Sequence, residues 1–322
     1  YLPNLEAYCE TCASIGMVFW NHRLALLHSD AKYADLVERL LYNGVISGIS
    51  LDGSKFFYVN PLASRGNHHR QPWYGCACCP TNVVRFIASL GHYPYASIGD
   101  GEGVCVLQYV GGAADIQLKS GNVRISQTTN YPWDGDIAIK VAPERPADFT
   151  MRVRIPAWCD NATLSVNGDP VDVIPDRGFV SISKKWKDGE RIHLNLPLHV
   201  RSIPANPHVE SQTGRMAVMR GPIVYCLEDV DNSCPVDQVA ISADATFKTE
   251  HLDDLLGGVT IPKVQGMRHG SVDTNNGLDA AENHIDLTMI PYFAWDNRKA
   301  GSMVVWIPNE LPKEVGDRGK SR

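Results

Sequence analysis

The chain has 322 residues, of which 44% are hydrophobic, 8% aromatic and 20% charged, a composition typical of a globular protein with room for about two domains. This composition excludes a disordered or fibrous chain. Thirty Lys and Arg against 36 Asp and Glu give a formal net charge of -6, so no broad positive field would attract nucleic acid. No apolar run reaches the roughly 18 residues that a membrane helix requires, so we expect no membrane partner.

The first 97 residues are predicted to be mainly helical, because apolar residues recur at helical spacing. Helices are expected over residues 13–27, 36–41 and 81–90. Ser29 and Asp30 offer an N-cap between the first two helices, and Asn43 with Gly44 offers a stop after the second. Pro80 suits the first turn of the third helix. Residues 50–79 form a long connection, and loops of that length are more often functional than idle.

From about Val104 onward the hydrophobic period changes to two, which predicts strands with one buried face. Strands are expected over residues 104–109, 151–155, 191–196 and 223–227. Asn167 and Gly168 supply a hairpin turn. The glycine-rich residues 99–103 precede a strand and no helix, so we interpret them as a domain junction. We therefore expect a helical domain over 1–97, a β-sandwich domain over 98–200 and a second β-sandwich domain over 201–322.

The nine cysteines are too few for a disulfide scaffold, and an odd number excludes complete pairing within the chain. Four are scattered along the strand-rich part and are expected to be buried small apolar side chains: Cys105, Cys159, Cys226 and Cys234. The other five lie in the first 79 residues, close to the expected starts of two helices. We expect any function of the thiols to reside in these five.

Six side chains in the helical part can serve as metal ligands: Cys9, Glu10, Cys12, Cys76, Cys78 and Cys79. Thiolates favour zinc, and four ligands from two separated segments give its tetrahedral count. Glu10 and Cys12 would diverge on a regular helix, so their joint use requires a non-helical entry before the helix. A purely structural zinc, a set of buried thiols and a Cys9–Cys12 redox pair are the alternatives.

Cys78 and Cys79 precede Pro80 and the expected third helix, where unpaired amide groups and the helix dipole favour an anion. Zinc and the dipole together would keep one of these thiols ionised at neutral pH, as a nucleophile requires. The residues alone do not decide which of the two it is.

Three motifs stand together in the first 82 residues: Tyr-x-Glu-Thr-Cys-Ala-x-Ile-Gly from Tyr8, Phe-Tyr-x-Asn-Pro-Leu from Phe57 and Cys-x-Cys-Cys-Pro-x-Asn from Cys76. With them the chain resembles glycoside hydrolase family 127, the β-L-arabinofuranosidase family, and the resemblance continues to Tyr225. It implies a partial (α/α)6 barrel followed by β-sandwich domains. It also implies a retaining glycosidase that releases terminal β-linked L-arabinofuranose from an oligosaccharide or glycoconjugate.

The same resemblance implies a zinc ion held by Glu10, Cys12, Cys78 and Cys79, with Cys78 as the catalytic nucleophile that forms a thioglycosyl intermediate. Sulfur would then replace the nucleophilic carboxylate that most retaining glycosidases use. The resemblance leaves Cys9 and Cys76 outside the metal shell.

The family's acid/base Glu lies shortly upstream of the position at which this sequence begins, at Tyr1 without Met. We therefore expect the chain to be the C-terminal portion of a longer protein, inactive alone and poorly soluble because helix faces are uncovered. The resemblance also implies a homodimer. Unpaired thiols persist best in reducing surroundings, which favours the cytoplasm, with the periplasm as the alternative.

Other residues have both a functional and a structural interpretation. Tyr58 can place its hydroxyl on a sugar or simply pack, and His68 and His69 can contact sugar hydroxyls or lie in a solvated loop. Glu38 matches a family motif, but we favour a structural ion pair with Arg39 or a distant Arg. Two other functions remain open: a carbohydrate-binding or assembly module with a structural zinc, and a glycosidase for a related deoxy-sugar.

Overall fold

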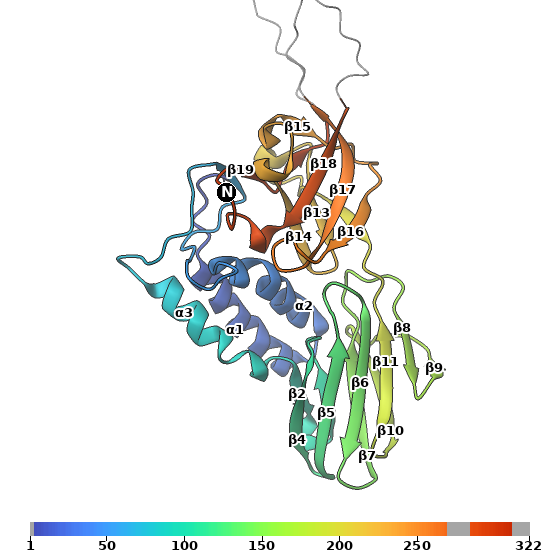
Figure 1. Cartoon of the computed structure of the whole chain (residues 1–322). Coiled ribbons are helices and arrows are strands. Elements are labelled where there is room, and N and C mark those ends of the chain that lie inside the picture. The colour runs from blue at the N-terminus through green and yellow to red at the C-terminus, as the bar shows by residue number, and fades with distance from the viewer. Residues whose placement is uncertain (1–2, 269–283, 311–322) are drawn as a thin grey trace, which may run out of the picture.

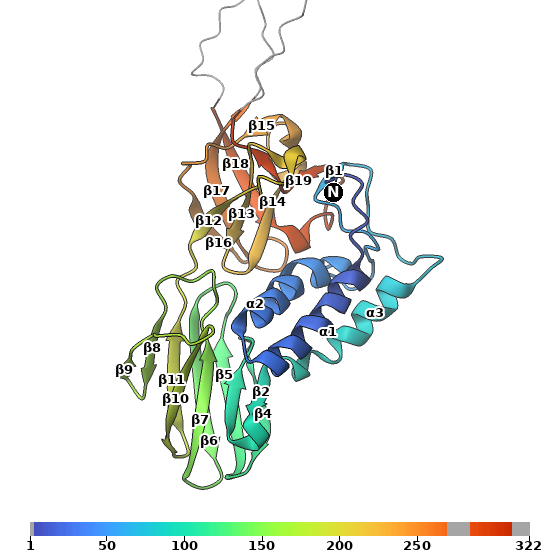
Figure 2. The same ribbon diagram turned by 180° about the vertical axis from the view of Figure 1, so that it is seen from behind.

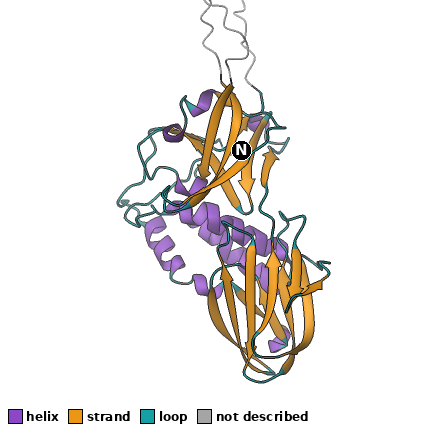
Figure 3. Ribbon diagram, turned by 45° about the vertical axis from the view of Figure 1, so that its right-hand side comes forward, coloured by secondary structure: helices purple, strands orange, loops and turns teal. Residues whose placement is uncertain are grey.

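The computed structural model describes residues 3–268 and 284–310, which form a helical part and two β-rich parts (Figure 1). The helical part contains α1 (Thr11–His28), α2 (Ala31–Arg39), α3 (Cys78–Ile87), the π-helix η1 (Leu40–Val45) and the 3-10 turns η2 (Ile46–Gly48) and η3 (Leu90–His92). It lies between the two β-rich parts (Figure 3). Among the described residues, no helix has the length and apolarity to cross a membrane.

The junction of α1 and α2 follows the predicted capping. Ser29 ends α1 in the left-handed region at φ 50°, and the Asp30 side chain accepts a hydrogen bond from the Lys32 amide at 3.1 Å. The predicted stop at Asn43 and Gly44 is wrong, because the chain continues as η1. The Asn43 side chain is occupied elsewhere, since it donates to a carbonyl and accepts an amide from the C-terminal part of the chain.

The middle part is a β-sandwich, as expected. One sheet has the order β10-β7-β3-β2 and the other β4-β5-β6-β11-β8-β9. Their bounds are β2 (Tyr95–Ile98), β3 (Gly103–Val106), β4 (Gly112–Leu118), β5 (Gly121–Thr129), β6 (Asp136–Pro143), β7 (Ala147–Arg154), β8 (Thr163–Val166), β9 (Asp169–Val171), β10 (Phe179–Trp186) and β11 (Glu190–Asn195). Alternating apolar side chains of both sheets, with the fully buried Trp186 among them, form one core.

Two loop expectations in this part have different outcomes. Asn167 (φ 54°) and Gly168 (φ 93°) form the predicted two-residue hairpin turn between β8 and β9. The glycine-rich segment is not a domain junction, because its turn, η4 (Gly99–Gly101), joins β2 to β3 within one sheet. The expected boundary at residues 97 and 98 therefore falls inside β2.

The strands of the C-terminal part, for which we expected a second sandwich, are connected by hydrogen bonds into one ten-stranded sheet. Strand β14 pairs with β18 on one side and with β13 and β19 on the other, which keeps the strands connected. Strand β1 (Ala63–Arg65), from the long connection in the helical part, pairs with β19. The other bounds are β12 (Val200–Pro204), β13 (Arg215–Arg220), β14 (Ile223–Glu228), β15 (Val239–Ala240), β16 (Lys248–Leu252), β17 (Val259–Arg268), β18 (His284–Pro291), β19 (Ser302–Val304) and β20 (Ile307–Pro308).

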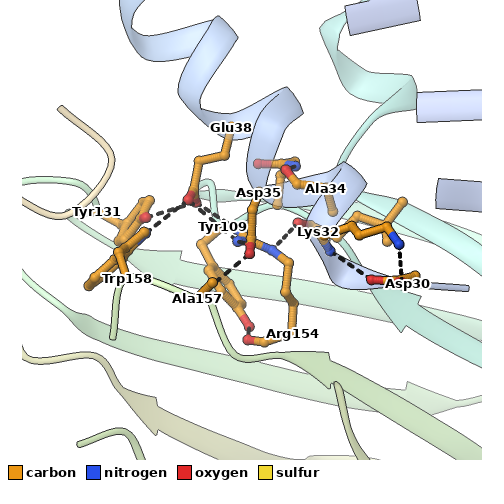
Figure 4. A network of polar contacts seen from close by, with 12 residues as sticks. Asp30, Lys32, Ala34, Asp35, Glu38, Tyr109, Tyr131, Arg154, Ala157 and Trp158 are labelled. Atoms are coloured by element: carbon orange, nitrogen blue, oxygen red, sulfur yellow. Dashed lines mark hydrogen bonds and ion pairs between the residues drawn. The ribbon is translucent and has the colours of Figure 1, made fainter. Parts of the chain in front are cut away.

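A buried ion cluster joins α2 to the middle domain (Figure 4). The Arg154 guanidinium, which is fully buried, donates to Glu38 and Asp35, each at 2.6 Å. Glu38 also accepts hydrogen bonds from the Tyr131 hydroxyl at 2.7 Å and the Trp158 indole at 3.2 Å. Glu38 therefore forms the structural ion pair that we favoured, and its partner is the distant arginine.

The three α-helices lie side by side and do not close into a ring within the described residues (Figure 2). Large apolar side chains are exposed along α1 and α3: Trp20 at 61%, Leu27 at 74% and Val84 at 55%. Helix α1 has apolar side chains at exposed as well as buried positions, and helices with apolar residues on several sides are ordinarily covered all round. The apolar faces of α1 and α3 are therefore exposed to solvent in the described residues.

Candidate metal and thiol centre

The first half of the centre lies where the chain enters α1. Glu10 is the N-cap residue, with extended backbone angles (φ -67°, ψ 141°), and it forms a β-bridge with Val59. This is the non-helical entry that joint use of Glu10 and Cys12 requires. Thr11, which is completely buried, fixes the entry, because its amide donates to the Tyr58 carbonyl at 3.1 Å and its hydroxyl to the Phe57 carbonyl at 2.9 Å.

Two glycines allow the segment after α2 to approach this entry closely. A Cβ on Gly48 would lie 2.4 Å from a methyl carbon of Thr11, and a Cβ on Gly44 would lie 2.5 Å from the Ser14 hydroxyl. Real side chains do not approach so closely, so any larger residue would push η1 or η2 away from the first turns of α1.

The second half of the centre is the first turn of α3. This helix begins at Cys78, three residues before the predicted start, so both adjacent cysteines are helical. Pro80 occupies the third helical position, where the missing amide hydrogen costs nothing. The Cys79 thiol is completely buried and reaches the Tyr58 carbonyl at 3.7 Å.

The four residues assigned to zinc by the resemblance come together, because the ligand atoms of Glu10, Cys12, Cys78 and Cys79 all lie within 4.8 Å of one another. The Cys78 and Cys79 sulfurs are 3.9 Å apart. Two sulfurs at about 2.3 Å from a tetrahedral ion would be about 3.8 Å apart, so the spacing fits zinc. Three thiols and one carboxylate from two segments can therefore hold a metal ion.

The three thiols of the cluster have different surroundings, which shift their pKa values in different directions. The Tyr58 hydroxyl lies at the Cys78 thiol, and this hydrogen bond lowers the pKa of Cys78. Burial raises the pKa of Cys12 and of Cys79. Of the three thiols in the cluster, Cys78 is thus the one whose surroundings favour the thiolate.

Asn82 also belongs to the centre, because its side-chain amide donates to the Cys12 sulfur at 3.4 Å. It lies one turn after the cysteine pair on α3, in the third motif of the sequence, where only its presence in the motif singled it out. Asn82 and Cys12 are 70 positions apart, so no other local pattern in the sequence indicates their contact.

The remaining predicted residues lie around the centre. Tyr58 faces Cys78, whereas His68 hydrogen-bonds the Val59 carbonyl at 3.0 Å and stacks on Phe57, so its ring is part of the packing. His69 is 40% exposed and lies 2.8 Å from an Asp296 oxygen of the C-terminal part.

All nine cysteines lie in the described residues and are free thiols. The four scattered ones are buried, as predicted. Cys9 and Cys76 are not among the four clustered ligands, although Cys76, which is exposed, hydrogen-bonds Cys78.

Three family models match successive stretches of the chain. They are described as the GH127 catalytic domain of β-L-arabinofuranosidase (residues 1–92), the GH127 middle domain (residues 103–198) and the glycoside hydrolase family 127 C-terminal domain (residues 200–308). The matches cover all three parts of the fold.

Individual relatives agree with these matches. A non-reducing end β-L-arabinofuranosidase of Bifidobacterium longum is 36% identical over 331 residues, covering 95% of this chain and 50% of the relative. The structure of a GH127 β-L-arabinofuranosidase from Geobacillus stearothermophilus T6 matches with a TM-score of 0.89 and 41% identity, over 95% of this chain and 51% of that one. A GH127 β-arabinofuranosidase structure matches with a TM-score of 0.90 and 43% identity, over 96% and 50%. The chain thus spans about half the length of these relatives.

Proposed function

Because the chain belongs to glycoside hydrolase family 127, we propose that it is the C-terminal portion of a retaining glycosidase that releases terminal β-linked L-arabinofuranose. The observation that carries the proposal is the convergence of Glu10, Cys12, Cys78 and Cys79 within 4.8 Å. We further propose that the open faces of α1 and α3 pack against helices from the rest of the polypeptide in an (α/α)6 barrel.

We propose zinc as the ion held by these four residues, where it would keep the thiols ionised. Cys78 is the proposed nucleophile, because it is half-exposed and its thiolate is favoured by Tyr58, while Cys79 is enclosed. Asn82 would orient Cys12 through its hydrogen bond.

In the proposed reaction the Cys78 sulfur attacks the anomeric carbon, and a carbon–sulfur bond forms as the glycosidic carbon–oxygen bond breaks. The leaving oxygen takes a proton from a carboxylic acid that we place outside residues 1–322. Water, deprotonated by the same group, then displaces the sulfur, so two inversions give net retention. Tyr58 would stabilise the sulfur anion before attack and again as the sulfur departs.

The test uses the full-length protein and p-nitrophenyl β-L-arabinofuranoside. Cys78→Ser should abolish hydrolysis, while Cys9→Ser, at a thiol outside the four clustered ligands, should retain it. The anomeric configuration of the first product, followed by proton NMR, should be that of the substrate. Inverted product, or full activity of the Cys78→Ser variant, would refute the proposal.

A haloacetamide derivative of arabinofuranose separates the enzyme from a sugar-binding module with a structural zinc. It should label Cys78, whereas label on Cys12 alone, or none, favours the structural role. Metal analysis of the wild-type protein should find zinc, which strong chelators remove together with activity. The free thiols also lead us to propose a reducing compartment.

A further inference from the structure

The segment that leads to Cys78 has little regular structure of its own. Between β1 and α3, the segment is tied to the helical part by a β-bridge between Phe56 and Gln71, with N···O distances of 2.8 and 2.9 Å, and by the Tyr74 hydroxyl, which accepts the Tyr58 amide at 3.2 Å and donates to the Phe56 carbonyl at 3.1 Å. Such a segment needs tertiary contacts to hold a nucleophile in place. The turn after β18 in the C-terminal domain adds contacts at residues 69 and 70.

Asp296 provides the central contact. One carboxylate oxygen accepts the Arg70 amide at 2.7 Å and the other lies 2.8 Å from His69 Nδ1, so one side chain holds two successive residues of the segment. The Asp296 side chain is 8% exposed, and its backbone has a φ of 55°, a left-handed conformation that Asp and Asn tolerate better than most residues. Glu228 in turn accepts the Asp296 amide at 2.9 Å, which fixes the turn.

Arg70 extends the same contact. Its guanidinium lies 4.1 Å from the centroid of the Phe57 ring and donates to the carbonyls of Ser47 at 2.5 Å and Trp295 at 3.1 Å. Trp295 stacks on Phe57 with ring centroids 4.9 Å apart. The C-terminal turn therefore contacts both the segment before Cys78 and Phe57, the residue before Tyr58.

These two segments meet at the thiol centre, since the Cys79 thiol reaches the Tyr58 carbonyl at 3.7 Å and lies 3.9 Å from the Cys78 sulfur. We propose that Asp296 is a positioning residue of the thiol centre. It holds residues 69 and 70, so that Cys78 keeps its position relative to Tyr58 and to the three other proposed ligands. The proposal rests on the proposed function for its catalytic consequence, but the geometry concerns the thiols themselves. A shift of about 1 Å in such a group can cost roughly 100-fold in rate.

The test compares three variants of the full-length protein. Asp296→Ala removes both acceptors. Asp296→Asn keeps an acceptor for the Arg70 amide and tolerates the left-handed backbone. Glu190→Ala is the matched control, because Glu190, at 15% exposed in the middle domain, also accepts a backbone amide (Lys187, 2.7 Å) and pairs with a basic side chain (Lys184, 2.7 Å) without touching the segment before Cys78.

The first measurement is zinc affinity, by competition with a chromophoric chelator. Groups that hydrogen-bond a metal ligand directly are typically worth about 10- to 100-fold in affinity. Asp296 acts through the backbone before Cys78, so Asp296→Ala should bind zinc roughly several-fold more weakly, while Asp296→Asn recovers most of the loss and Glu190→Ala matches wild type. The second is the rate at which iodoacetamide alkylates Cys78 in the metal-free protein, read by mass spectrometry, which should change only in Asp296→Ala. For arabinofuranoside hydrolysis, kcat should fall more than KM changes.

Equal zinc affinity and equal Cys78 alkylation in Asp296→Ala and Glu190→Ala would overturn the positioning role. A wild-type protein that binds zinc and yet hydrolyses no arabinofuranoside would instead refute the proposed function, and the metal and alkylation comparisons would still decide the role of Asp296. A loss shared by all three variants, with a matching fall in thermal midpoint, would assign the effect to stability and also overturn it.

Discussion

Replacing Arg154 with Met tests the energetic role of the ion cluster that joins α2 to the middle domain. The guanidinium is fully buried, and it pairs with Glu38, which is 1% exposed, and with Asp35, which is 15% exposed. Methionine fills much of the same volume without the charge. The variant thus leaves two carboxylates facing a site from which their counter-ion has been removed.

Removing one partner of a buried ion pair typically costs about 3–5 kcal/mol, because the remaining charge is uncompensated. Glu38 keeps the hydroxyl of Tyr131 and the indole of Trp158 as donors, so we expect the lower half of that range, about 3–4 kcal/mol. Adding Glu38→Gln removes the orphaned charge, so the double variant should be no less stable than Arg154→Met alone.

The assay is urea unfolding of the full-length protein, followed by circular dichroism and by tryptophan fluorescence. Arg124→Met is the matched control, because Arg124 pairs with Asp115 at 2.8 Å in the same domain but both side chains are more than half exposed. Its loss should be under about 1 kcal/mol. If Arg154→Met lost no more than Arg124→Met, the cluster would not be the interdomain contact that its burial indicates.

Three further predictions concern the thiol centre and its supports. Tyr58→Phe removes the hydrogen bond that lowers the pKa of Cys78, so Cys78 alkylation at pH 7 should slow several-fold and its rate profile should move to higher pH; an unchanged profile would contradict the role of the hydroxyl. Gly48→Ala places a methyl group 2.4 Å from Thr11 and should destabilise the protein by about 1–3 kcal/mol in urea unfolding, whereas Gly91→Ala, at an open position without a left-handed backbone, serves as the control for crowding. Asn43→Ala leaves the partly buried Val224 amide of β14 without its acceptor and the buried Pro222 carbonyl without its donor, and it should cost about 1–3 kcal/mol; a loss near zero would show that water replaces the side chain.

Local patterns predicted much of the secondary structure. Helical spacing placed α1 within two residues of its ends, and the capping role of Asp30 followed from its side chain. Strict alternation located β7 and β11, and the turn at Asn167 and Gly168 followed from the conformations those two residues allow. These features depend on neighbours in the sequence.

The errors and omissions involve contacts between distant residues. Asn43 looked like a helix stop because its side chain often caps, but a strand about 180 residues away uses that side chain instead. The earlier start of α3 brings Cys78 into the helix, which the position of Pro80 alone did not indicate. Asp296 had no local signal at all, because its importance comes only from the residues that the fold brings to it.

The four-ligand cluster could be predicted only in part. Spacing and thiol chemistry narrowed the ligands to six side chains and to zinc, and the family resemblance then selected four of them. The structure brings those four together. Periodicity carries no information about which of several neighbouring thiols turn toward each other, since that depends on how η2, α1 and α3 pack.

The pairing of β1 with β19 has a practical consequence for anyone who exchanges domains between relatives of this protein. Three residues that precede the thiol centre's Cys78 in the chain complete the edge of a sheet whose other strands lie more than 130 residues later. A chimaera joined near residue 200 would graft a foreign sheet onto a native edge strand, so donor and recipient must be matched in both places. A recombination point chosen only from the domain limits would therefore separate β1 from the strand with which it pairs.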